Sequence, residues 1–186
     1  GVSRLGGKSL FIGKIGRDPN GSSYKKLLEK SGVYSALGLH DKMTGSAITF
    51  ITPDSERSFA TYLGAAAYIV EDDIKEALLK GAKILHVEGY SFDMPEVRDA
   101  VIKAMRIAKD YGIKVSLDLA DPGVIRRNKT ILGRVIKNYV DIVFANEKEA
   151  EEFTKLIPRK ALDKIYKDCE LAVVKLGIKG SMIKAN

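Results

Sequence analysis

Short apolar runs alternate regularly with amphipathic helical stretches between residues 72 and 183, and this alternation leaves few folds open to the chain. The helical stretch opened by Asp93 and Pro95 keeps apolar side chains on one face until Gly112 ends it. Apolar runs separated by helices of this length form right-handed βαβ units, so the pattern predicts a mostly parallel sheet covered by helices. The runs expected to form its strands are Ile84–Val87, Val115–Leu119, Ile142–Phe144 and Ala172–Val174, with Ser181–Ile183 as a hairpin partner.

The preceding part of the chain contains fewer regular elements. Ser9–Ile12 is a short apolar run that predicts a buried strand. Ser22 or Ser23 is placed to cap the helix that follows it. Asp72 or Asp73 is expected to cap a further helix leading into the alternating region.

The stretch from residue 33 to residue 61 differs from both of these regions. Its short apolar and threonine-containing runs flank the turn residues Pro53–Glu56, which is typical of antiparallel hairpins. We therefore expect an α/β core formed by residues 1–32 and 62–186, with residues 33–61 as a small β-rich lid.

Composition excludes several classes of function. The formal charge of +7 comes from 31 basic and 24 acidic residues spread along the chain, which is typical of a solvated surface. No zinc finger, helix-turn-helix or aromatic RNA motif is found, so we expect no nucleic-acid partner. No apolar run approaches the ~20 residues of a membrane span, so no membrane association is expected either. The single cysteine, Cys169, fits a reducing compartment and hence a cytoplasmic protein.

Candidate site residues follow the apolar runs. In an open parallel sheet, ligands bind beyond the carboxyl ends of the strands, so polar groups after successive strands are expected to meet at one rim. His86, within a run, is instead expected to be a satisfied core histidine. The groups that follow the runs are Glu88–Ser91, Asp118 with Asp121, Asn146–Glu149, and Lys175 with Gly177 and Gly180.

Two of these groups each allow two interpretations. Asn146 and Glu149 begin a predicted helix, where an amide and a carboxylate either cap the helix or hold magnesium and phosphates. Gly177 and Gly180 either supply simple turn geometry or let a phosphate approach the backbone beside Lys175.

Several segments, taken in order, resemble motifs of the PfkB family, which includes ribokinase, fructokinase and adenosine kinase. Any one of them is a weak signal, but their order and spacing identify the chain as a member of that family. The segments are Gly1–Lys8 with Phe11–Gly21, Thr44–Gly45 with Glu56–Ser58, Asp118–Pro122, Asn146–Glu149, and Val174–Gly180.

The resemblance implies a ribokinase-like three-layer α/β sandwich with a β lid, and transfer of the γ-phosphoryl group of ATP to a hydroxyl of a sugar or nucleoside. Glu149 would organise Mg²⁺, and Arg57 would reach phosphate from the lid. A homodimer formed through the lid is also implied. The nucleotide would contact Asn146, Lys175, Gly177 and Gly180, although many family members have threonine where Lys175 stands.

The segment from Glu56 to Ala66 resembles the adenosine-kinase branch most closely, which favours an adenosine-like substrate. In that branch Phe59, Thr61 and Leu63 would face the substrate. The alternative for Phe59 and Leu63 is ordinary hairpin packing. Tyr90, which follows an apolar run, is placed to stack on a base or ring.

The resemblance also predicts what lies outside the chain. A substrate-binding strand is expected before Gly1, and the GAGD segment with the general-base aspartate is expected beyond Asn186. No catalytic residue is therefore assigned within this chain, and we expect the fragment to be inactive. The alternatives are a non-catalytic nucleotide- or sugar-binding module and a purely structural fragment.

Overall fold

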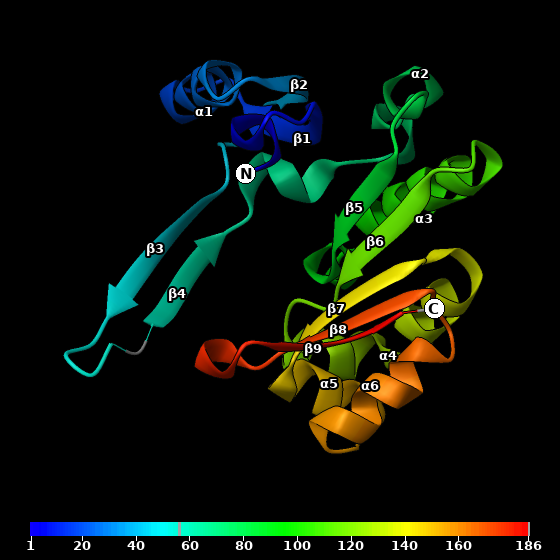
Figure 1. Cartoon of the computed structure of the whole chain (residues 1–186). Coiled ribbons are helices and arrows are strands. Elements are labelled where there is room, and N and C mark those ends of the chain that lie inside the picture. The colour runs from blue at the N-terminus through cyan, green and yellow to red at the C-terminus, as the bar shows by residue number, and fades with distance from the viewer. Residues whose placement is uncertain (56, 186) are drawn as a thin grey trace. The chain divides into compact units, whose positions relative to one another are not determined.

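The computed structural model describes residues 1–55 and 57–185, and the chain divides into two compact units. The first unit runs from Gly1 to Ile74 and the second begins at Lys75. Figure 1 shows the elements of both, and each unit is described by itself.

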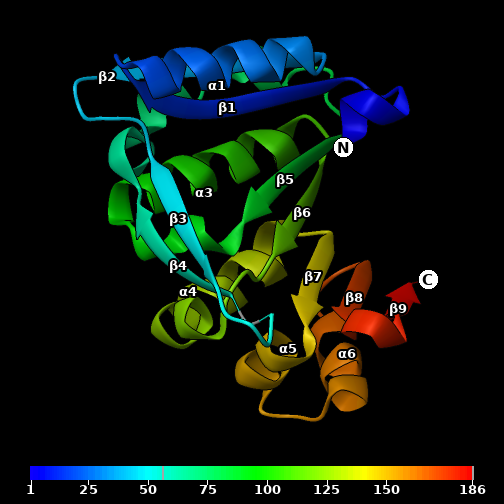
Figure 2. The ribbon, with the colours of Figure 1, turned by 90° about the vertical axis from the view of Figure 1, so that its left-hand side faces the viewer.

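The first unit contains a parallel pair of strands and a separate hairpin. Strands β1 and β2 pair in parallel from Ser9↔Val33 to Gly16↔His40. Helix α1 connects these strands and lies along them (Figure 2). The elements are η1 (Val2–Leu5), β1 (Ser9–Gly16), α1 (Pro19–Lys30), β2 (Val33–His40), β3 (Ser46–Ile51), β4 (Arg57–Tyr62), η2 (Gly64–Tyr68) and η3 (Glu71–Asp73).

Helix α1 begins earlier than the sequence suggested. Its cap is Asp18, whose side chain accepts a hydrogen bond from the Gly21 amide at 2.8 Å, so the prediction of a serine cap is wrong. Asp18 precedes Pro19, which is well suited to the first helical position because it lacks an amide hydrogen. Asp18 also accepts hydrogen bonds from the Thr44 amide at 2.6 Å and the Thr44 hydroxyl at 2.8 Å.

The predicted hairpin is present but shorter than expected. Strands β3 and β4 pair antiparallel, from Ser46↔Tyr62 to Ile51↔Arg57. The expectation is wrong for Val33–His40, because that run pairs in parallel with β1. Glu56, part of the predicted turn, lies outside the described residues. The division into a core of 1–32 and 62–186 with a lid of 33–61 stays a prediction.

The second unit is built on one sheet with the strand order β5-β6-β7-β8-β9. Neighbours from β5 to β8 are parallel, and β9 is antiparallel to β8, as the sequence predicted. The elements are α2 (Glu76–Leu79), β5 (Ile84–Glu88), η4 (Gly89–Asp93), α3 (Pro95–Asp110), β6 (Lys114–Asp118), α4 (Pro122–Tyr139), β7 (Ile142–Asn146), α5 (Glu147–Thr154), α6 (Pro158–Tyr166), β8 (Leu171–Lys175), η5 (Gly177–Lys179) and β9 (Ser181–Ala185).

The core of this unit lies between the sheet and its helices. Alternate strand residues such as Val115, Leu117, Val143 and Val174 are fully buried, together with the apolar side of α3 and α4. The other face of the sheet is more open, and Ile84 at one edge is 55% exposed.

The helix expected from Asp72 or Asp73 is split into η3 and α2. Asp73 accepts a hydrogen bond from the Val70 amide at 2.8 Å and forms an ion pair with Lys14 at 2.6 Å. These contacts hold Asp73 in a single 3₁₀ turn, and Ile74 then continues in an extended conformation. Across the described ranges, none of the helices combines the length and the apolar character that a membrane span requires.

Candidate active site

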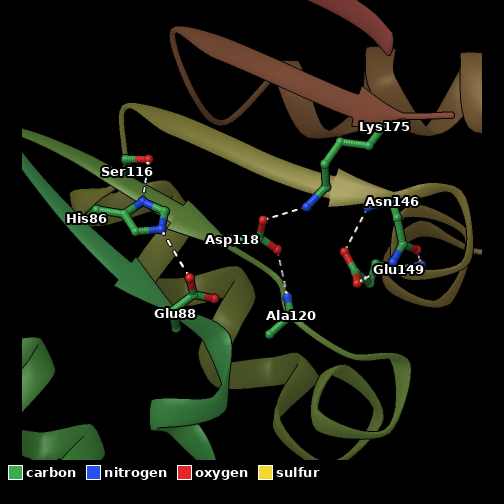
Figure 3. Close-up of polar contacts among 8 residues, drawn as sticks. All are labelled: His86, Glu88, Ser116, Asp118, Ala120, Asn146, Glu149 and Lys175. Atoms are coloured by element: carbon green, nitrogen blue, oxygen red, sulfur yellow. Dashed lines mark hydrogen bonds and ion pairs between the residues drawn. The ribbon is translucent and has the colours of Figure 1, made fainter. Parts of the chain in front are cut away.

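Polar groups from successive strands meet at the carboxyl edge of the second unit's sheet. The register pairs Glu88 with Asp118 and Asn146 with Lys175, so the ends of β5 and β6 lie side by side, as do those of β7 and β8. Asp118 pairs with Phe144, so β7 and β8 extend two residues further than β6. Figure 3 shows Asp118, Asn146, Glu149 and Lys175 close together at this edge. The structure therefore brings together the groups that the sequence placed at one rim.

Asn146 and Glu149 form a reciprocal cap at the start of α5. The Glu149 amide donates to Asn146 Oδ1 at 2.9 Å, and Glu149 Oε2 accepts from the Asn146 amide at 2.7 Å. The Asn146 side-chain amide also donates to Glu149 Oε1. The capping interpretation of this motif thus holds in the structure.

The environment of Glu149 also gives it unusual acid–base properties. The residue is only 3% exposed. Burial raises the pKa of Glu149, and the nearby Asp118 and Asp121 carboxylates raise it further, while the Asn146 amide and Lys175 oppose the change. A buried carboxylate with a raised pKa at a sheet edge is a common property of functional sites.

The oxygen donors at this edge suit magnesium in their chemistry, since Mg²⁺ binds through one or two carboxylates together with substrate phosphates. Among the residues that the structure describes, no group of three histidine, cysteine or acidic side chains forms a metal cage. Glu149 thus fits Mg²⁺ as a single protein carboxylate, with a phosphate as a further ligand of the same ion.

Lys175 forms an ion pair with Asp118. Lys175 Nζ lies 2.6 Å from Asp118 Oδ2, and the Ala120 amide donates to Asp118 Oδ1 at 3.0 Å. The sequence placed both residues at the rim but gave Asp118 no partner. The two residues are 57 positions apart. No local pattern signals such a pairing, and only the strand order β6-β7-β8 reveals it.

Gly177 and Gly180 shape the turn between β8 and β9. Both have positive φ, 60° and 89°, and the Leu176 amide donates to the Gly180 carbonyl at 2.8 Å. Turn geometry therefore explains both glycines. A Cβ atom added at either position would meet no atom within 4 Å, so the turn is also open to a ligand.

Tyr90 and His86 lie near the end of β5. Tyr90 is 56% exposed, and its pKa is raised by partial burial and by the charges of Asp121, Glu149, Glu88 and Asp118. The prediction that His86 is a core residue is wrong, because its side chain is exposed. It lies on the open face of the sheet, where Nδ1 is 3.0 Å from the Ser116 hydroxyl and Nε2 is 3.4 Å from Glu88 (Figure 3).

The predicted substrate residues of the lid belong to the first unit. Arg57, Phe59 and Thr61 occupy alternate positions of β4, so they share one face of the hairpin. Leu63 follows the strand directly. Phe59 is 60% exposed and Leu63 is 45% exposed, so packing within the hairpin buries neither side chain.

The chain is similar to kinases of known family. The family described as "pfkB family carbohydrate kinase" matches residues 1–186. Fructokinase-2 of Solanum lycopersicum is 30% identical over 191 residues, which cover 96% of this chain and 58% of that protein. Probable fructokinase-5 of Arabidopsis thaliana is 37% identical over 121 residues, covering 63% of this chain and 37% of its own length. This chain therefore spans well under two thirds of these relatives.

Solved structures are similar over nearly the whole chain. Adenosine kinase from Sinorhizobium meliloti superposes with a TM-score of 0.93 at 31% identity, covering 99% of this chain and 57% of that one. A putative ribokinase II from E. coli, in complex with ATP and Mg²⁺, superposes with a TM-score of 0.89 at 25% identity, covering 99% of this chain and 61% of that one. The fold is therefore the ribokinase-like α/β fold, and the chain belongs to the pfkB family of carbohydrate kinases.

Proposed function

We propose that this chain forms the nucleotide side of an ATP-dependent kinase that transfers the γ-phosphoryl group to a hydroxyl of a sugar or nucleoside. The observation that carries this proposal is the meeting of Asn146, Glu149 and Lys175 beside the Gly177 turn, in a chain of the pfkB family. An amide, a buried carboxylate and an ammonium group together suit a magnesium-bound polyphosphate.

Each residue has a distinct part in this proposal. The Lys175 ammonium neutralises phosphate charge, and the Gly177–Gly180 turn lets the nucleotide approach the backbone. Glu149 holds Mg²⁺ beside the phosphates, with Asn146 orienting its carboxylate. When bound, Mg²⁺ would neutralise charge on the phosphate oxygens and so favour transfer.

We propose an adenosine-like nucleoside as the favoured acceptor, with a sugar such as fructose as its rival. The exposed rings of Phe59 and Tyr90 support a nucleoside, because aromatic faces stack on bases. Within the first unit, Thr61 and Leu63 would contact the acceptor together with Phe59, and Arg57 would reach a phosphate from the lid. The related proteins carry both names, fructokinase and adenosine kinase, so their names do not decide the acceptor.

The test has two parts, binding and turnover. ATP binding to this chain is measured by calorimetry, with and without Mg²⁺, and ADP formation is measured with adenosine, ribose or fructose present. We expect binding without turnover, since none of the residues assigned here is the general base. Phosphorylation by this chain would refute the expected inactivity. A longer protein carrying this chain that binds ATP yet phosphorylates no acceptor would favour the non-catalytic module.

A further inference from the structure

The ion pair between Lys175 and Asp118 spans the carboxyl end of β7. Lys175 stands at the end of β8 and Asp118 at the end of β6, and these two strands flank β7. The Lys175 side chain extends across this end toward Asp118, close to Asn146 and Glu149 (Figure 3). The ion pair therefore lies where the proposed nucleotide phosphates would approach.

The Asp118 side chain is more constrained than the Lys175 side chain. The Asp118 side chain is 20% exposed, and its second oxygen accepts a hydrogen bond from the Ala120 amide at 3.0 Å. The Lys175 side chain is 45% exposed, and a lysine has a flexible four-carbon stem. Of the two, Lys175 can change its partner without disturbing the backbone.

We propose that Asp118 competes with the nucleotide for Lys175. Asp118 holds the ammonium group in the free chain, and a nucleotide phosphate takes its place when ATP binds. Asp118 is thus a residue that sets nucleotide affinity, and this role rests on the function proposed above.

The energies of the two partnerships favour such an exchange. A partly exposed ion pair contributes little net stability, because both charges are well solvated when apart. A nucleotide triphosphate carries several negative charges and accepts stronger, charge-assisted hydrogen bonds. The exchange leaves Lys175 paired throughout, so no ammonium group is left without a counter-charge.

The experiment compares four variants of this chain by calorimetric titration with ATP in the absence of divalent metal. Asp118→Asn keeps an oxygen for the Ala120 amide but removes the charge that holds Lys175. Lys175→Met removes the cation, and the double variant tests whether the two effects depend on each other. Glu88→Gln is the matched control, because this substitution removes the same negative charge at the same edge of the sheet. Glu88 pairs in register with Asp118.

The exchange predicts opposite effects for the two partners. Asp118→Asn should bind ATP about two- to fivefold more tightly, which corresponds to releasing a partly exposed ion pair. Lys175→Met should bind roughly tenfold more weakly, through loss of a charge-assisted contact. In a chain that already carries Lys175→Met, adding Asp118→Asn should strengthen ATP binding no more than Glu88→Gln strengthens it in the unchanged chain.

Other outcomes separate this inference from the proposed function. If the unchanged chain binds ATP and Asp118→Asn binds it more weakly or equally, the exchange is wrong and the nucleotide site stands. If neither the unchanged chain nor Asp118→Asn binds ATP, the nucleotide site is wrong and the exchange with it.

A second measurement does not depend on any variant folding. The Lys175 ammonium resonance of the unchanged chain, followed by ¹⁵N NMR, should shift on ATP addition as its partner changes. A resonance that stays fixed at saturating ATP would overturn the exchange.

Discussion

Asp141 makes hydrogen bonds to several neighbouring parts of the sheet in the second unit. Its side chain is 5% exposed and accepts hydrogen bonds from the Val115 amide at 2.7 Å and from Lys109 at 3.0 Å. Its backbone carbonyl accepts from the amides of Glu170 and Leu171. Asp141, which directly precedes β7, thereby links the starts of β6, β7 and β8.

Replacing Asp141 by asparagine should lower the free energy of unfolding by about 1–3 kcal/mol, because charged hydrogen bonds in a buried position are lost. Urea denaturation of this chain measures the change. Asp163→Asn is the matched control, since Asp163 pairs with Lys184 on the surface and its loss should barely move the midpoint. An Asp141→Asn chain as stable as the unchanged one would contradict this account.

The same residue predicts a pH dependence. Burial alone would raise the pKa of Asp141, but the Val115 amide and the Lys109 and Lys114 charges outweigh it and lower the pKa below 3.8. A lowered folded-state pKa means that the stabilisation is complete above the unfolded value and is lost as pH falls through the folded value. The stability difference between the unchanged chain and Asp141→Asn should therefore shrink below about pH 4.

The pKa of Glu149 is shifted in the opposite direction to that of Asp141, and this shift predicts a pH dependence of metal-dependent binding. Burial raises its pKa, so the ionised form that attracts Mg²⁺ accumulates only as pH rises through that raised value. The gain in ATP affinity on adding Mg²⁺ should grow with pH in the unchanged chain. Glu149→Gln should remove that growth and reduce the gain by about tenfold or more, as found for residues that support metal sites. Calorimetry at several pH values checks both, and a gain independent of pH would count against Glu149.

At the scale of elements, the sequence predicts local patterns better than long-range pairing. The strands from Ile84 onward follow from apolar runs between helices, and the structure confirms their parallel order. The parallel pairing of Val33–His40 with β1 was missed, because a short apolar run does not reveal its partner. Within the site, the Asn146–Glu149 cap was among the alternatives that local spacing suggested. The pairing of Lys175 with Asp118 depended on which strands are neighbours.

Two glycines test the packing of individual elements. Gly133 lies within α4 with no atom within 4 Å of an added Cβ, whereas a Cβ at Gly16 would lie 2.6 Å from the Thr44 amide and the Lys42 carbonyl. Gly133→Ala should raise the free energy of unfolding by roughly 0.5–1 kcal/mol through reduced backbone entropy. Gly16→Ala should lower it, because backbone atoms must move apart. Thermal denaturation distinguishes the two, and equal effects would contradict the packing described for β1.

For the molecule as a whole, we expect self-association to involve the hairpin of β3 and β4. Ile48, Phe50 and Tyr62 share the face opposite Arg57 and are each at least 50% exposed. We expect this face to support the proposed homodimer, since contiguous exposed apolar patches mark interaction sites. Phe50→Lys should shift sedimentation toward the monomer, while Thr49→Lys on the other face should not. A monomeric unchanged chain would refute the proposal.

The placement of Asp141 has a consequence for how this protein can change. The anchor that joins β6, β7 and β8 lies at their starts, while Asp118, Asn146 and Lys175 lie at their ends. The contacts that stabilise the sheet and the residues of the candidate site therefore lie at opposite ends of the same strands. Substitutions in the loops that follow the strand ends can therefore be used to alter the proposed nucleotide or acceptor preference. Such substitutions leave the contacts of Asp141 at the strand starts unchanged, so the sheet should stay folded.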